Sequence, residues 1–323
     1  MPYGSRLQPT GYHSERVGPP DSPCHHPPMT GALQRATVAA VWDQQSVWSQ
    51  AAGQLKQQVV RARVTALALG LVAAASGTAA SQVMAWSDTA GKVLAFAAAV
   101  AAGCAPLSAR RGGPDKVSDW TRLRAVSEAL KAETYVCLAG AGAYRDDGGS
   151  DLLRERAQRF VTEGGDLLRH ITGVTAVQRP LPEVEDMRSY VDQRLRRQLD
   201  GYYRPRAAYM QRKVRLHERA EFALGGVGAV LAAVAATWNE EQIAAWVAVA
   251  ASVGVAVTAH ALAQRYAYQQ LEFTRTSEEL ERLLTQWSAC SEPTPEVVDR
   301  FVNECEHVIS VQNEAWMIRW AVG

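Results

Sequence analysis

Four long stretches without a charged residue determine how this chain can fold. They cover residues 64–87, 93–109, 222–239 and 242–264, and are 24, 17, 18 and 23 residues long. An apolar helix of about 20 residues, within a range of about 17 to 25, crosses the hydrocarbon core of a bilayer. Each stretch is therefore long enough to span a membrane. The alternative is a large soluble bundle in which these Ala-rich helices are buried on all sides.

The residues beside the stretches favour a membrane. Basic residues flank the open ends of both pairs: Lys56, Arg61, Arg63, Arg110, Arg111 and Lys116 around the first pair, and Arg212, Lys213, Arg215, Arg219 and Arg265 around the second. The charged residues of the two connecting turns are Asp88 and Lys92 in the first, and Glu240 and Glu241 in the second. Because basic residues are retained on the cytoplasmic side, the sequence predicts two hairpins with outward-facing tips and cytoplasmic termini.

Aromatic residues agree with this orientation. Trp86, Trp238 and Trp246 fall at the predicted outer boundary, and Tyr266 and Tyr268 fall at the inner one. Amphipathic rings prefer these two interfaces. We therefore expect a multi-pass protein of the plasma membrane, with both termini in the cytoplasm.

One plan of helices is used twice along the chain. Residues 1–31 form a Pro-rich tail that is expected to be disordered and lacks the apolar core of a signal peptide. The first unit covers residues 32–178, and the second covers residues 179–323. The predicted spans are about 64–86 and 92–109 in the first unit, and about 222–239 and 242–264 in the second. The fold class is therefore all-α, with two transmembrane hairpins above a cytoplasmic helical bundle.

Local signals mark three of the cytoplasmic helices. Residues 32–63 are helical in character and lead into the first hairpin without a break. Residues 183–220 lead into the second hairpin, with a kink expected at Pro205. The last helix begins with Thr294 as its N-cap and Pro295 at its first helical position.

Charge is segregated between two of the expected cytoplasmic segments. Residues 188–219 contain ten Arg or Lys and three acids, whereas residues 272–306 contain nine acids and three Arg. The two segments can pair side by side in the bundle. Alternatively, Arg212, Lys213, Arg215 and Arg219 hold anionic lipid headgroups, at about 1 kcal/mol each. A third interpretation is that Arg204, Arg206 and their neighbours hold the phosphates of a nucleotide.

Small residues follow single faces of the predicted spans. They are Gly70, Gly77 and Ser81 on the first span, Gly225 and Gly228 on the third, and Gly254 and Thr258 on the fourth. Such faces allow helices to pack closely, and those with hydroxyl groups can line an aqueous path. The middle of each span has no ionisable residue, which argues against a proton-coupled transporter. Four helices enclose little space, so a pore requires several copies.

The sequence predicts neither an enzyme nor a cofactor. It has no zinc-binding His-Glu-x-x-His run, no phosphate-binding Gly loop and no Gly-x-Ser-x-Gly motif. Cys24, His25 and His26 lie together in the tail without a second pair of ligands, so no metal site is expected. With 34 basic and 33 acidic residues, the chain lacks the charge of a nucleic-acid-binding protein.

The helices beside the second hairpin resemble a known family. The matching residues before it are Tyr190, Val191, Asp192, Gln193, Arg194, Leu195, Gln198, Tyr202, Tyr203, Ala207 and Arg212. Those after it are Tyr268, Leu271, Glu272, Phe273, Thr274, Leu280, Leu284, Glu304, Glu306, Val308, Ile309, Ser310, Asn313, Glu314 and Trp316. This pattern resembles the SLATT domain (SMODS- and SLOG-associating two-transmembrane effector). The first unit resembles it more weakly, through Trp120, Arg124, Ala125, Glu128, Lys131 and Tyr144.

The resemblance implies a tandem SLATT protein that acts as a membrane effector in prokaryotic conflict systems, including anti-phage defence. Such effectors are proposed to form pores when a nucleotide second-messenger pathway is triggered. The resemblance therefore implies membrane lipids and further copies of the chain as partners, and a functional link to a nucleotidyltransferase or nucleotide sensor. It supplies no catalytic residue. The alternative is a non-conducting, membrane-anchored scaffold that recruits a cytoplasmic partner.

Overall fold

The computed structural model describes residues 32–145, 148–238 and 241–321. The predicted disordered tail, including Cys24, His25 and His26, lies outside these residues. The described residues form helices and no strand. The helices of the first unit are α1 (Ala32–Val83), α2 (Asp88–Arg110), α3 (Pro114–Leu138), η1 (Gly142–Tyr144), α4 (Gly149–Glu163), η2 (Gly165–Leu167) and α5 (Leu168–Ile171). Those of the second are α6 (Met187–Tyr190), η3 (Val191–Arg196), η4 (Leu199–Tyr203), α7 (Arg204–Trp238), α8 (Glu241–Gln264), α9 (Tyr266–Ser288) and α10 (Pro295–Ala321).

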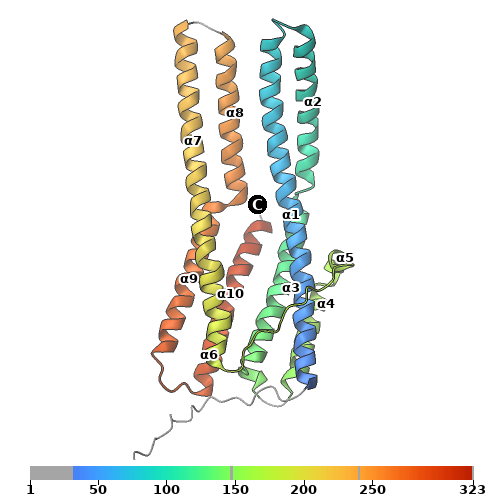
Figure 1. Cartoon of the computed structure of the whole chain (residues 1–323), viewed down its shortest axis with the longest axis vertical. Helices are drawn as coiled ribbons and strands as arrows, with labels where there is room; N and C mark the ends of the chain where they lie inside the picture. Colours follow the sequence, from blue (N-terminus) through green and yellow to red (C-terminus); the bar gives the residue numbers. More distant parts are fainter. Residues whose placement is uncertain (1–31, 146–147, 239–240, 322–323) are drawn as a thin grey trace, which may run out of the picture.

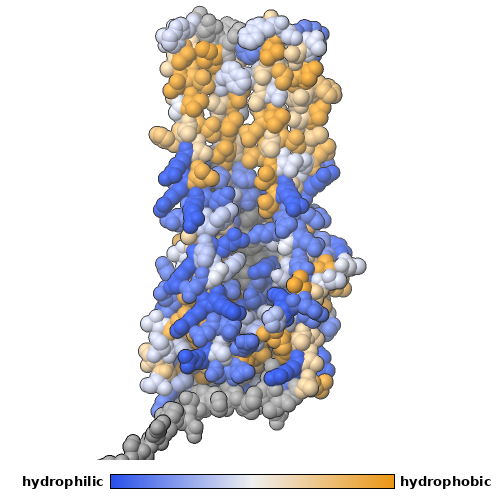
Figure 2. All heavy atoms as spheres, in the orientation of Figure 1, coloured by the Kyte–Doolittle hydropathy of each residue, from blue (hydrophilic) through white to orange (hydrophobic). Residues whose placement is uncertain are grey.

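Two helical hairpins form one end of the elongated molecule. The upper part of α1 packs against α2, and the upper part of α7 packs against α8 (Figure 1). Among the described residues, four helices are long and apolar enough to cross a membrane. At most 11% of the most apolar segment of each is buried. Figure 2 shows this end covered by hydrophobic side chains, above a hydrophilic lower half. The apolar stretches are exposed, so the alternative of Ala-rich helices buried in a soluble bundle is not supported.

The first hairpin has a short turn with its own caps. The helix α1 ends at Val83, three residues before the predicted end of the span, because the chain must turn before Ser87 caps α2. The Ser87 hydroxyl accepts a hydrogen bond from the amide of Ala90. Lys92 and Asp88 form an ion pair of 2.6 Å one helical turn apart. The two predicted charged residues of this tip therefore neutralise one another.

The opposite end is a helical bundle to which both units contribute one hydrophobic core. The lower part of α1 packs on α3, and α10 packs on both α3 and α9. The largest fully buried side chains include Trp48 of α1, Leu123 of α3 and Tyr190 of α6. Because these residues belong to one core cluster, the two units are a single folded body at this end.

The connection between the units is extended and is fixed to α1. It follows α5 and ends at α6, where Asp186 caps the helix. The amide of Val177 donates to the Ser46 hydroxyl, and the Gln50 side chain donates to the carbonyl of Thr175. Arg179 donates to Gln45 at 2.6 Å. The predicted boundary between the units is therefore packed against the first unit.

The helical path into the second hairpin contains π-turns rather than a simple kink. The segments η3 and η4 are π-helical, and α7 follows immediately with Pro205 as its second residue. A π-turn shifts the backbone hydrogen-bond register by one residue. Pro205, which has no amide hydrogen to donate, follows such a turn and is accommodated there. The predicted start of the last helix is confirmed, since the Val298 amide donates to the Thr294 carbonyl at 3.0 Å and Pro295 is the first helical residue.

Candidate functional site

A buried ion pair lies where the two units meet in the bundle. The Arg194 and Glu306 side chains are 1% and 8% exposed. Arg194 donates through Nε and Nη2 to the two Glu306 carboxylate oxygens, at 2.8 and 2.5 Å. The Tyr190 hydroxyl donates to the same carboxylate at 3.0 Å. The guanidinium also lies 4.6 Å from the ring centre of Tyr135 in α3, so this pair connects η3 and α10 to the first unit.

Burial and charge act in opposite directions on this pair. Burial lowers the pKa of Arg194, but the Glu306 carboxylate raises it more, so its pKa lies above the ordinary value. Burial together with Glu306 raises the pKa of Tyr190. Both effects hold Arg194 charged and Tyr190 protonated. Among the described residues, no partner is found for the buried Arg194 Nη1, so the carboxylate is the main compensation for this charge.

Two ionisable residues of α3 surround the ion pair. Burial raises the pKa of Glu128, but Arg124, at 2.5 Å, outweighs it, and the net pKa is lowered. Burial lowers the pKa of Lys131 to about 8, although Glu128 opposes the shift. The cluster therefore places buried and half-buried charges of both signs next to one another where the units meet.

The small residues of the spans are mostly not used for packing within one chain. A Cβ atom built on Gly77 would lie 3.9 Å from Ala98 of α2. Around Gly70, Gly225, Gly228 and Gly254, by contrast, the part of the chain that the structure describes places nothing within 4 Å of such an atom. These four positions are therefore open in a single copy.

The two hydroxyl residues of the predicted faces bond within the chain. Ser81 donates to the carbonyl of Thr78 in its own helix at 2.8 Å. Thr258 of α8 donates at 2.8 Å to Glu221 of α7. Both hydroxyl groups therefore have hydrogen-bond partners within one copy. That these faces line a pore formed by several copies stays a prediction.

Comparisons with known proteins identify the second half of the chain. The family described as SMODS and SLOG-associating 2TM effector domain 1 matches residues 190–316. Residues 190–316 are a SLATT domain. A second family, described as a protein of unknown function (DUF4231), matches residues 46–150, and its position fits a tandem form. No curated protein and no solved structure matches the chain.

The SLATT match begins at Tyr190 and includes Arg194 and Glu306. The sequence pattern contained all three residues but did not show that they touch, because Arg194 and Glu306 are 112 positions apart. Their opposite charges on two facing helices were the only available signal. The structure therefore assigns a physical role to these family positions, which is to hold η3 to α10 within the second unit and to place Arg194 against Tyr135 of the first.

The predicted pairing of the basic and acidic segments is confirmed at two places. Besides the buried pair, Arg204 contacts Glu281 at 3.0 Å. The residues nearest the membrane differ, since Arg212, Arg215 and Arg219 are exposed and Lys213 is half-buried. The ammonium group of Lys213 lies 5.6 Å from the ring centre of Tyr209. Lipid binding by these four residues stays a prediction.

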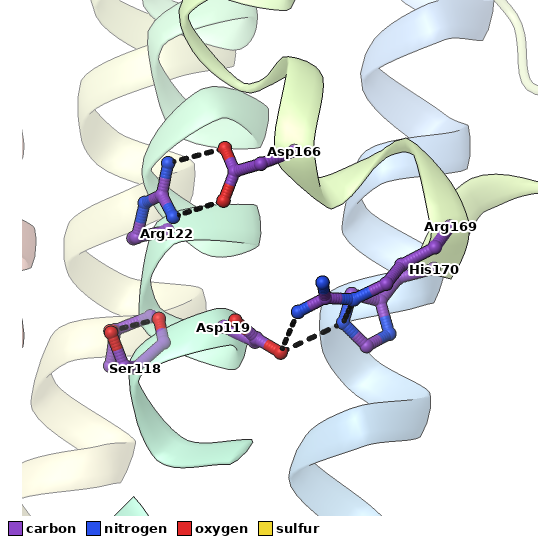
Figure 3. A network of polar contacts seen from close by, with 7 residues as sticks. Ser118, Asp119, Arg122, Asp166, Arg169 and His170 are labelled. Atoms are coloured by element: carbon purple, nitrogen blue, oxygen red, sulfur yellow. Dashed lines mark hydrogen bonds and ion pairs between the residues drawn. The ribbon is translucent and has the colours of Figure 1, made fainter. Parts of the chain in front are cut away.

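A second polar network fixes the end of the first unit onto α3 (Figure 3). Arg122 donates to both carboxylate oxygens of Asp166, at 2.5 and 2.7 Å. Asp119 contacts Arg169 and His170, each at 2.9 Å. Burial raises the pKa of Asp119, but the hydrogen bonds from Arg169 and His170 outweigh burial and lower it. In residues 32–145, 148–238 and 241–321 no group of three or more His, Cys, Asp or Glu could hold a metal.

Proposed function

We propose that the chain is a membrane effector that assembles into a pore, or disrupts the bilayer, when an intracellular signal acts on its bundle. The SLATT match is the observation that carries this proposal, because its description is that of a two-transmembrane effector domain. The four apolar helices supply the membrane part. The setting implied by the family is a prokaryotic conflict system linked to a nucleotide second messenger.

The open glycine positions support assembly from several copies. Four helices enclose too little space for a water-filled path, and Gly70, Gly225, Gly228 and Gly254 have room around them in one chain. In a membrane, small residues at a helix surface favour close packing with another helix. Packing between copies would use these faces and place the hairpins around a common path.

The continuity of two helices supports control from the bundle. The helix α1 runs unbroken from the bundle into the first span, and α7 runs into the third. Between α8 and α9, by contrast, Arg265 adopts a left-handed conformation with φ of 51°. A rearrangement between the units in the bundle would therefore move α1 and α7 as rigid rods, while the fourth span can turn at Arg265. In this arrangement the bundle is cytoplasmic and the hairpin tips face outward.

Membrane potential in cells that overexpress the chain tests the proposal. We expect depolarisation and growth arrest from the native chain, and loss of both effects in Gly254→Leu. The described residues leave room for a Cβ atom at this position within one copy, so loss of the effect would indicate contact between copies. The matched control is Val255→Leu on the same helix, where the native side chain is already 70% exposed.

The alternative function, a non-conducting scaffold, predicts a different result. A scaffold needs its spans only as an anchor, so overexpression would leave the potential unchanged. Its Gly254→Leu variant would behave like the native chain. Depolarisation by the native chain that survives in Gly254→Leu would argue for a general disturbance of the bilayer rather than a defined pore.

A further inference from the structure

A cavity of about 210 Å³ lies between α1, α3, α7 and α9, below the hairpins. Three cationic side chains line it, each from a different helix: Lys56 from α1, Arg124 from α3 and Arg206 from α7. The rings of Trp120 and Tyr202 also line it. None of the described residues that form its wall is acidic. The two units therefore bring three positive charges around one space.

The electrostatics of Lys56 show the effect of this arrangement. Burial, followed by repulsion from Arg206 and Arg124, lowers the pKa of Lys56 to about 8. Its ammonium group lies 5.3 Å from the ring centre of Trp120, and the side chain is only partly exposed. An anion inside the cavity would reduce this repulsion and favour the charged form of Lys56.

Of the two arginines in the wall of the cavity, Arg124 is paired through one guanidinium nitrogen with Glu128, at 2.5 Å. Two arginines nearby are likewise paired with carboxylates. Arg194 is paired with Glu306, and Arg204 contacts both Asp200 and Glu281. Arg206, in contrast, lies over the Tyr209 ring at 5.8 Å and reaches the cavity. Of the two arginines that the sequence indicated as phosphate ligands, the structure therefore brings one, Arg206, to a cavity.

We propose that this cavity binds a phosphate group, held by Lys56, Arg124 and Arg206. Arg206 can donate a pair of hydrogen bonds to phosphate oxygens, Arg124 can donate from the nitrogens that its ion pair with Glu128 leaves, and the Lys56 ammonium group supplies a compact charge. The flanking rings of Trp120 and Tyr202 suit a flat or apolar group attached to the phosphate. The phosphate can belong to a small soluble molecule or to a lipid headgroup, and both have the same binding chemistry.

Occupancy of the cavity would connect the two units. Lys56 and Arg124 belong to the first unit, and Arg206 belongs to the second. A shared anion would draw α1 and α7 together, and both helices continue into spans. This consequence for conduction rests on the proposed function, whereas the binding itself does not.

Binding is measured with the purified full-length chain. In detergent micelles, sodium pyrophosphate is titrated by calorimetry, and thermal unfolding is followed with and without it. In a second arm, nanodiscs of phosphatidylcholine alone are compared with nanodiscs that also contain phosphatidic acid. We expect saturable binding in at least one arm, with an increase in Tm.

Two kinds of variant test the site itself. Lys56→Met and Arg206→Met each remove one charge-assisted contact, and we expect roughly 10- to 100-fold weaker binding. The Tm of each variant without ligand is measured as well, which separates lost binding from lost folding. Gly53→Trp fills the cavity from a position where the described residues leave space, and Gly53→Ala is its matched control.

The outcomes are distinct. Pyrophosphate binding that Lys56→Met weakens and Gly53→Trp abolishes supports a soluble phosphate ligand, provided that the control variants Gly53→Ala and Arg215→Gln retain it. A response only to phosphatidic acid with the same variant pattern supports a lipid headgroup. No binding in either arm, or binding that survives both variants, overturns the proposal. Neither binding measurement depends on ionic current. A protein that binds phosphate but does not conduct would therefore refute the proposed pore and leave the proposed binding site standing.

Discussion

Replacing Glu306 by glutamine would leave the buried Arg194 charge without its carboxylate. The two side chains are 1% and 8% exposed, and two charge-assisted hydrogen bonds join them. Removal of one partner of a buried ion pair costs about 3 to 5 kcal/mol of folding free energy. Each kcal/mol lowers Tm by roughly 2 to 4 °C in a domain of about 200 residues, so we expect Glu306→Gln to lower Tm by roughly 6 to 20 °C.

Thermal unfolding of the full-length chain in detergent micelles measures this effect. Tryptophan fluorescence reports on the bundle, because Trp48 is fully buried in its core. The control is Glu281→Gln, which breaks an exposed pair with Arg204 and should cost at most about 1 kcal/mol. The double variant Arg194→Met with Glu306→Leu should recover most of the loss, since neither member of the pair is left as a buried charge without its partner.

Equal effects of Glu306→Gln and Glu281→Gln on Tm would refute this reasoning. So would a double variant that is as unstable as the sum of its two single variants. Either result would mean that water or another group reaches Arg194, and that the pair does not stabilise the contact between η3 and α10.

Three further predictions concern charge and packing. Sulfate keeps its charge near neutral pH, and its binding in the cavity can be measured by calorimetry. The affinity should fall as the pH rises through about 8, because Lys56 loses its proton while Arg124 and Arg206 remain charged. An affinity that does not change with pH would contradict this prediction. The pKa of Asp119 is lowered, so its stabilisation is present above the pKa of the unfolded state and lost as the pH falls through the folded value. Asp119→Asn should therefore cost about 1 to 2 kcal/mol at neutral pH and little in acid, as measured by urea unfolding at several pH values. Gly164→Ala would place a Cβ atom 2.8 Å from the buried Trp48 ring, so Tm should fall by several degrees; an unchanged Tm would show that the ring can move.

Local sequence signals were sufficient for the helices and the hairpins. Charge-free stretches with basic flanks identified the four membrane-spanning helices, and Thr294 followed by Pro295 identified the start of α10. These signals work because hydrophobic length and capping act within one helix. The soluble-bundle alternative needed the structure, because only the exposure of the apolar stretches distinguishes the two cases.

Individual contacts between helices that are distant in the chain could not be predicted from the sequence. The complementary charge of two segments predicted their pairing, but many pairs of opposite charge were possible, and Arg194 with Glu306 could not be selected from sequence. The cavity combines Lys56, Arg124 and Arg206 from three helices whose rotation about their axes is set by packing. The left-handed Arg265 was also missed, because this conformation is typical of glycine and is rare for other residues.

Ionic current across bilayers that contain the purified full-length chain tests the central claim most directly. Liposome dye release and single-channel recording are carried out with protein shown to be folded and inserted. The proposed pore predicts discrete conductance or dye release that Val255→Leu retains and Gly254→Leu abolishes. A folded, inserted protein that passes no current and releases no dye, with and without pyrophosphate, nucleotides and phosphatidic acid, would contradict it.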